Sequence, residues 1–484
     1  MISITLISQK LSQLTLSQGI KQSLLYGASI ALMKGVSLLM LPFIANHIAA
    51  QEFGRLEVIS TLAVIGSILV GMGLEDTLFR FAGTEQSLQK RKQIAAEIFT
   101  ITLIIGFATL LCGWFIAPLI TPSFPSQPSV YEVRLVLTML ALEGAIAIPL
   151  GWLRMNNKAI SFFFASTGRA LLQAMLVIVF LYLDRGVTGI LEAGLIATML
   201  QTLALTLLQL RDTGLKFSLK TCQKSFIYSL PIVASGLVAF ALNGMDRWIL
   251  AEHAGLEEVA EFGIAAKFAL AMVLLMQPFG MWWSPRRFEV LNGNNGKQKV
   301  TEFIAMGSAI ALLITVAVAL ISPALIIYLL PESYQQAAQY VIAIALVMLL
   351  KELVELFNIG CFNGNTTSSQ LIINIIGAVV GMLAMLWLAP QYQVWGIIFS
   401  LLLAQFIRFV LFYNVSQHFL PLNYPIRALL VLTILSGLWL LLGLQVNDLT
   451  QSIMMMLVAT TSLLFIAHYL GLIHLPTLRH RKVA

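Results

Sequence analysis

Charged side chains occur inside long apolar stretches of this 484-residue chain. A charge in the hydrocarbon of a bilayer is costly, so such residues commonly pair with one another or mark a pathway for a polar substrate. Four cations form the first group, which we interpret as the lining of a substrate site: Lys34, Arg80, Arg247 and Lys267. Eight residues form the second group, for which we consider ion coupling or gating: Glu75, Asp76, Glu143, Arg169, Asp246, Lys351, Glu355 and Arg408.

The four cations fall in the first two apolar stretches of each half of the chain. If these stretches face one another, their cations line a positive cavity. An unpaired Lys or Arg at that depth would cost roughly 2.5–3.5 kcal/mol or more. Water or an anionic ligand removes most of this cost, and phosphate or pyrophosphate suits both the Arg fork and the Lys point charge.

A structural interpretation is open for several of these residues. Asp246 can neutralise the adjacent Arg247. Lys351 and Glu355 stand four residues apart, on one face of a helix, where they can form a self-contained pair. Long side chains near span ends can reach the membrane interface, as Arg80 and Arg408 would. Glu143 and Arg169 can form a structural or gating pair.

Composition excludes most classes of soluble protein. Hydrophobic residues make up 59% of the chain and charged residues 11%, against roughly 25% charged in soluble domains. The net charge of +7 is typical of cytoplasmic loops that face anionic lipid, so we expect no nucleic-acid partner. Three cysteines and six histidines show no ligand spacing, which predicts no disulfide and no metal site. The predicted loops are short, so we expect no extramembrane domain that could hold a catalytic centre.

Fourteen apolar stretches predict an all-α integral membrane protein, because each is close to the roughly 20 residues that a helix needs to cross a bilayer. The stretches are 22–48, 56–80, 95–120, 131–152, 161–183, 187–209, 226–250, 262–283, 302–330, 335–360, 369–388, 393–417, 426–443 and 452–474.

An internal repeat divides these spans into two halves. Glu52-Phe53-Gly54 follows span 1, and Glu261-Phe262-Gly263 follows span 7. Two parallel six-helix halves with a substrate site between them recur in secondary transporters. We therefore expect two pseudo-symmetric six-helix bundles around a central cavity. The predicted parts are a cytoplasmic segment 1–21, a first bundle 22–210, a basic linker 211–225, a second bundle 226–418, two extra helices 419–475 and a basic cytoplasmic tail 476–484.

The positions of Lys and Arg predict the orientation. Most of the 29 basic residues flank the even-numbered span ends or lie in the two termini, and Arg55, Arg134 and Arg185 are those on the opposite side. Basic residues concentrate on the cytoplasmic side of membrane proteins. Both termini should therefore be cytoplasmic.

Several short motifs are spread along nearly the whole chain. The first runs from Lys34-Gly35 through Leu41-Pro42-Phe43 to Glu52-Phe53-Gly54. The others are Gly73-Leu74-Glu75 to Arg80-Phe81, Asp246-Arg247-Trp248-Ile249-Leu250, Glu261-Phe262-Gly263 with Lys267, Tyr334 to Ala338, and Pro390 to Gly396. These motifs resemble those of the polysaccharide transporter, or oligosaccharide flippase, family, which includes O-antigen flippases, and the first resembles the family's opening.

The resemblance implies a fold and a function. It implies the superfamily of multidrug, oligosaccharidyl-lipid and polysaccharide exporters, and hence alternating access across a bacterial inner membrane. The implied substrate is an undecaprenyl-pyrophosphate-linked oligosaccharide for O-antigen, capsule or exopolysaccharide, bound by Lys34, Arg247 and Lys267. The implied partners are membrane lipids, a polysaccharide polymerase and chain-length proteins. Apart from the resemblance, the sequence contains no G-x-x-x-x-G-K-[ST] nucleotide-binding motif, so no cofactor is expected and any uphill drive would come from a proton or sodium gradient.

Three other functions compete with this one. A lipid-linked peptidoglycan-precursor flippase would share the architecture. A multidrug or cation antiporter of the same superfamily would need an acidic cavity. The cations of spans 1, 2, 7 and 8 argue against such a cavity. A polysaccharide polymerase would need a sizeable outer loop with catalytic acids, and the cluster Glu257, Glu258 and Glu261 is too small for that.

Overall fold

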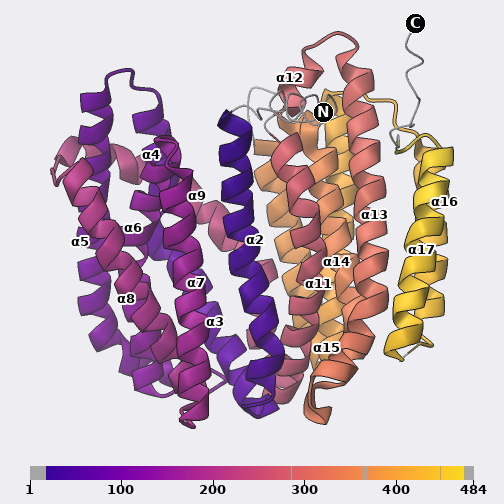
Figure 1. Ribbon diagram of the computed structural model, residues 1–484, viewed down its shortest axis with the longest axis horizontal. Coiled ribbons are helices and arrows are strands. Elements are labelled where there is room, and N and C mark those ends of the chain that lie inside the picture. The colour runs from indigo at the N-terminus through magenta and orange to yellow at the C-terminus, as the bar shows by residue number, and fades with distance from the viewer. Residues whose placement is uncertain (1–17, 285, 363–367, 447, 474–484) are drawn as a thin grey trace, which may run out of the picture. The chain divides into compact units, whose positions relative to one another are not determined.

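The computed structural model describes residues 18–284, 286–362, 368–446 and 448–473, and every regular element within these ranges is a helix (Figure 1). The predicted tail 476–484 lies outside the described residues. So does the predicted N-terminal segment 1–21, except that the first helix begins at Gln18. The prediction of an all-α protein is confirmed.

Twelve helical segments of the described chain are long and apolar enough to cross a membrane. One of them, Ser369–Phe419, contains two helices, because Gln393 has a left-handed φ of 50° and a ψ of −123° that interrupt the helical path. The helix Ala337–Phe357 has 21 residues and is long enough to span as well. The described chain thus contains the fourteen predicted spans.

Contacts divide the chain into two compact units. The first unit runs to residue 40 and continues through 66–118 and 130–233. The second comprises 41–65, 119–129 and the chain from 234 onward. The two bundles predicted at 22–210 and 226–418 stay a prediction.

The first unit is built from transmembrane helices joined by short turns. Its elements are α2 (Gln18–Ala45) to residue 40, the end of α3 (Ala50–Gly71), α4 (Leu74–Gly83), α5 (Leu88–Ile120) to residue 118, α6 (Val130–Met155), α7 (Ala159–Tyr182), α8 (Gly186–Asp212) and α9 (Leu219–Asn243) to residue 233. Asn157 (φ 57°) ends the turn after α6, and Asp184 (φ 55°) lies in the turn after α7. Asn and Asp adopt this left-handed conformation more readily than other non-glycine residues.

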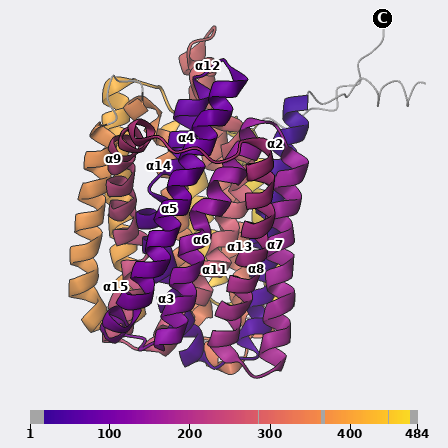
Figure 2. The same cartoon turned by 90° about the vertical axis from the view of Figure 1, so that its left-hand side faces the viewer.

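Two sets of packed helices form the interior of the first unit. Helix α8 packs against both α6 and α7, and α4 packs against α6 (Figures 1 and 2). Leu78 of α4, Phe99 of α5 and Trp152 of α6 are fully or almost fully buried in one apolar cluster. Trp152 donates its indole N–H to Asp212 Oδ2 at 2.8 Å, and Lys92 Nζ lies 2.8 Å from Asp212 Oδ1. The carboxylate thus ties the end of α8 to α5 and α6.

The second unit contains the remaining helices. They are the end of α2, α3 to residue 65, the end of α5, η1 (Thr121–Ser123), the end of α9, α10 (Met245–His253), α11 (Leu256–Trp283), α12 (Arg287–Leu291), α13 (Gly296–Leu329), η2 (Glu332–Tyr334), α14 (Ala337–Phe357), η3 (Asn358–Phe362), α15 (Ser368–Phe419), α16 (Ile426–Gly443) and α17 (Leu449–Tyr469). Helix α14 packs against α11, α13 and α15. The last two helices, α16 and α17, pack against α13 and each other (Figure 1).

Candidate functional site

Four charged side chains of the second unit form one ion cluster: Glu57 of α3, Asp246 and Arg247 of α10, and Lys267 of α11. Glu57 Oε2 accepts from Arg247 Nε at 3.3 Å, and Glu57 Oε1 forms an ion pair with Lys267 Nζ. Arg247 Nη1 donates to both oxygens of Asp246 at 3.0 Å. The side chains of Glu57 and Asp246 are only 7% and 4% exposed, whereas Lys267 is 35% exposed. Two acids and two bases therefore neutralise one another in a largely buried setting.

The phenylalanines of the two repeated motifs lie beneath the two cations. Lys267 Nζ lies 4.6 Å from the ring centroid of Phe53, and Arg247 Cζ lies 5.4 Å from that of Phe262. Both rings are almost fully buried. A cation within about 6 Å of an aromatic face is attracted by the ring quadrupole. Each repeated motif thus helps to position one cation of the cluster.

The glycines of the same motifs bring α3 and α11 together. A Cβ on Gly54 would lie 1.7 Å from the carbonyl oxygen of Leu256, and a Cβ on Gly263 would lie 2.8 Å from Glu57 Cγ. Both distances are shorter than side chains tolerate. The helices can approach this closely only because neither position has a side chain. A further tie comes from Trp248 of α10, whose indole N–H donates to Thr61 Oγ1 of α3.

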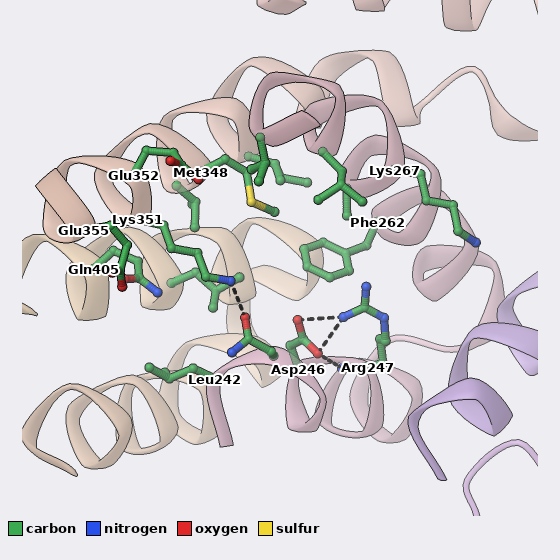
Figure 3. Close-up of a pocket in the computed structure, with 17 residues that line it drawn as sticks. Leu242, Asp246, Arg247, Phe262, Lys267, Met348, Lys351, Glu352, Glu355 and Gln405 are labelled. Atoms are coloured by element: carbon green, nitrogen blue, oxygen red, sulfur yellow. Dashed lines mark hydrogen bonds and ion pairs between the residues drawn. The ribbon is translucent and has the colours of Figure 1, made fainter. Parts of the chain in front are cut away.

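A cavity of about 460 Å³ lies beside the ion cluster and is lined by α9, α10, α11, α14 and α15 (Figure 3). Apolar side chains such as Phe262 and Met348 form much of its wall. Its charged lining residues gather at two ends, with Asp246, Arg247 and Lys267 at one and Lys351, Glu352 and Glu355 at the other (Figure 3). Its volume and largely apolar wall with a few charged groups are typical of small-molecule sites.

The second group of candidates contributes to the far end of this cavity. Lys351 Nζ donates to Asn243 Oδ1 at 2.8 Å, and among the described residues no ion pair joins it to Glu355. Arg408 lies next to the cavity and is held by neutral amide oxygens, at 2.9 Å from Asn374 Oδ1 and 2.5 Å from Gln405 Oε1. Gln405 itself lines the cavity.

The remaining candidates lie in the first unit. Glu75 forms an ion pair with Arg154 of α6, while Asp76 and Arg80 are exposed on α4. Glu143 Oε1 accepts from Ser67 Oγ at 2.5 Å.

Lys34 is half-buried on α2, and Arg169 Nε is buried without a hydrogen-bond partner among the described residues. The structure thus brings Arg247, Asp246 and Lys267 together within one unit. The proposed meeting of Lys34 and Arg80 with them stays a prediction.

Sequence reasoning missed Glu57, the residue that joins the two cations. It lies three residues after Gly54 of the first repeated motif and inside the predicted span 56–80. Charged residues inside predicted spans were the candidates for the site, so Glu57 met this criterion as well as Lys34 did. Thr61, which accepts from Trp248, carried no comparable signal because a threonine is ordinary in a membrane helix.

Comparison with known proteins relates the chain to transporters. A family model described as polysaccharide biosynthesis protein matches residues 43–339, which include the whole ion cluster. No curated protein sequence matches the chain. Among solved structures, the lipid II flippase MurJ in an inward-closed conformation has a TM-score of 0.73 and 14% identity, over 92% of this chain and 99% of that one.

Multidrug transporters are also similar in structure. The MATE multidrug transporter DinF-BH, solved as a complex, has a TM-score of 0.59 and 15% identity, over 84% of this chain and 96% of that one. An inward-facing MATE family transporter of the MOP superfamily has a TM-score of 0.57 and 15% identity, over 82% and 95%. At these identities the likeness establishes the fold, which is that of these membrane transporters.

Proposed function

This chain belongs to the polysaccharide biosynthesis protein family, and we propose that it is a flippase for undecaprenyl-pyrophosphate-linked oligosaccharides in surface polysaccharide synthesis. The glycan would become O-antigen, capsule or exopolysaccharide. The protein would move its substrate without making or breaking covalent bonds. Membership of the family supports the role in polysaccharide synthesis, and the transporter fold supports movement across the membrane.

The observation that carries this proposal is the pair Arg247 and Lys267 on the wall of the cavity. An Arg fork and a Lys ammonium side by side suit the oxygens of a diphosphate. The largely apolar wall strengthens such charge interactions, because the local dielectric constant is lower than that of water. The polyprenyl tail would remain in lipid while the diphosphate and the sugars enter the protein.

We further propose that transport proceeds by alternating access in the bacterial inner membrane, with both termini in the cytoplasm. A proton or sodium gradient would supply the drive, with Glu75, Asp76 or Asp246 as candidate carriers. Lys34 and Arg80 would complete the cationic site. A polymerase and chain-length proteins would receive the flipped units on the outer side.

A second candidate substrate is a lipid-linked peptidoglycan precursor. The structural likeness to a lipid II flippase extends over 92% of the chain, and lipid II is part of that protein's name. The ion cluster does not favour one of these two substrates over the other, because it would contact only the anionic linkage that both contain. The charge of the wall does not separate a multidrug substrate from these two, because Asp246, Glu352 and Glu355 balance Arg247, Lys267 and Lys351.

The test is made on lipid extracts from cells with and without the protein. Lipid-linked oligosaccharide is quantified in each leaflet with a membrane-impermeant label. Accumulation on the cytoplasmic face after depletion supports the proposal, and accumulation of a peptidoglycan precursor there supports the second candidate. An unchanged lipid-linked pool would favour an antiporter. Loss of long polymer with short units outside would indicate a polymerase.

A further inference from the structure

Glu57 occupies the position that an anionic ligand would need in order to bridge the two cations of the cavity wall. One of its oxygens pairs with Lys267 and the other with Arg247. The amino group of Lys267 points away from Lys351 and Glu355 at the opposite end of the cavity (Figure 3). In this arrangement the Glu57 carboxylate is paired with the ammonium group of Lys267 and the guanidinium group of Arg247, which a ligand would have to engage.

The cluster is neutral as it stands, because Glu57 and Asp246 balance Arg247 and Lys267. An incoming anion therefore meets cations that already have partners. It can bind them only by replacing a carboxylate, and of the two acids Glu57 is the one that contacts both cations. Asp246 is adjacent to Arg247 in sequence and would remain paired with it.

We propose that Glu57 is a built-in competitor that selects for diphosphate. This inference rests on the proposed function and adds the residue that sets its specificity. A carboxylate released from both cations is left largely buried, which is costly. An anion that engages one cation offsets little of this cost. A diphosphate carries more negative charge than a single phosphate and can present a separate phosphoryl group to each cation, so it offsets more of the cost of displacing the carboxylate.

The exchange would also change how the helices are held together. Glu57 is the acid through which α3 is ion-paired to α10 and α11, so its release removes those two ion pairs at once. Binding of a diphosphate would therefore loosen α3 from its neighbours. A ligand shifts a conformational equilibrium only through such a difference in contacts between the two states.

The experiment measures binding of inorganic pyrophosphate and inorganic phosphate to the purified full-length protein in detergent, by titration calorimetry. Glu57→Gln removes the competing charge, so we expect it to bind pyrophosphate about tenfold more tightly than the unaltered protein. The gain should be smaller for inorganic phosphate. Adding Lys267→Ala to Glu57→Gln should abolish the gain.

Glu52→Gln is the matched control. Glu52 lies on the same helix and pairs with Arg55 at 2.8 Å, but it is more exposed and does not contact the two cations. Its neutralisation should leave pyrophosphate affinity unchanged. Glu57→Asp, which keeps the charge on a shorter side chain, provides a second variant if Glu57→Gln does not fold, and it should tighten binding by a smaller factor.

Equal or weaker pyrophosphate binding by folded Glu57→Gln would overturn the inference, as would the absence of binding to every variant. The leaflet assay separates this from the proposed function. If depletion still accumulates lipid-linked oligosaccharide on the cytoplasmic face while Glu57→Gln shows no gain, only the competition is refuted. If the gain is found and the lipid pool does not respond, the competition stands and the proposed substrate is wrong.

Discussion

Gly263 of α11 lies directly against the side chain of Glu57 of α3, and a Cβ at Gly263 would come within 2.8 Å of Glu57 Cγ and 2.9 Å of its carboxylate. Because this glycine leaves room, the Glu57 carboxylate lies between Arg247 and Lys267 rather than being displaced from α11. The repeated Glu-Phe-Gly motif is therefore part of the candidate site. Its glycines set the distance between α3 and α11, and its phenylalanines lie under the cations.

Gly263→Ala should destabilise the protein and disturb the ion cluster. The added methyl group must displace Glu57, and forced overpacking of this kind typically costs about 1–3 kcal/mol. We expect a lower midpoint of thermal unfolding in detergent. Gly280→Ala on the same helix is the control, because nothing lies within 4 Å of the Cβ that it adds. That variant should be neutral or slightly more stable, since alanine is the better helix former. Equal effects of the two changes would contradict this account.

Lys267→Ala should insert normally but reduce export of lipid-linked oligosaccharide. The change removes one of the two cations proposed to hold the diphosphate and leaves Glu57 with Arg247 alone. Adding Lys34→Ala should reduce export further, to at least about tenfold below the unaltered protein, a change that corresponds to about 1.4 kcal/mol. The measurement is the rate at which outer-leaflet substrate appears in cells that lack the native protein.

Lys297→Ala serves as the control for those variants, because Lys297 is exposed at the start of α13. Its export should equal that of the unaltered protein. Normal export by Lys34→Ala with Lys267→Ala, at normal protein level in the membrane, would refute the anion site.

Tyr334→Phe should destabilise the second unit. The Tyr334 hydroxyl is buried and donates to the backbone oxygen of Ile48 at 2.7 Å, so it ties the turn after α13 to the turn after α2. Removing the hydroxyl leaves a buried carbonyl without its donor, which costs about 1–2 kcal/mol. Tyr328→Phe changes a tyrosine that is 71% exposed and should have no measurable effect on the unfolding midpoint.

The same tyrosine should make stability depend on alkaline pH. Burial raises the pKa of Tyr334 above its ordinary value, whereas an unfolded tyrosine ionises near pH 10. As the pH rises, the unfolded state therefore loses this proton first. The contribution of Tyr334 to the free energy of unfolding is complete below about pH 10 and falls as the pH rises further. Between about pH 9 and pH 11 the unaltered protein should lose more stability than Tyr334→Phe. A smaller loss than in that variant would contradict the assignment.

The sequence was sufficient to predict the helices because each span had to be both long and apolar. The predicted stretch 426–443 coincides with α16, and 131–152 differs from α6 by a few residues at its ends. Larger differences arose where a helix extends beyond its apolar stretch, as α13 does by starting at Gly296 against a predicted start at 302. Hydropathy reports the thickness of the hydrocarbon, so it does not report polar turns that continue a helix into water.

The candidate site was less predictable, because pairing depends on side chains that are distant in sequence. Arg247 and Lys267 were found as charges within spans, and the Asp246 pair was anticipated from adjacency. The partner that joins the two cations, Glu57, lies 190 residues before Arg247, and no local pattern indicates such a contact. The repeat did indicate where to search, since Glu57 follows the first motif as Lys267 follows the second.

The orientation predicted from the basic residues can be tested by labelling single cysteines. After replacement of Cys112, Cys222 and Cys361, a cysteine is introduced at Gln127 or at Lys220, both of which are exposed. Gln127 follows an odd-numbered span and Lys220 lies in the basic linker, so they should be on opposite sides of the membrane. A membrane-impermeant maleimide should label Gln127→Cys in intact spheroplasts and Lys220→Cys only after permeabilisation. The reverse pattern would invert the topology and with it the direction of transport proposed here.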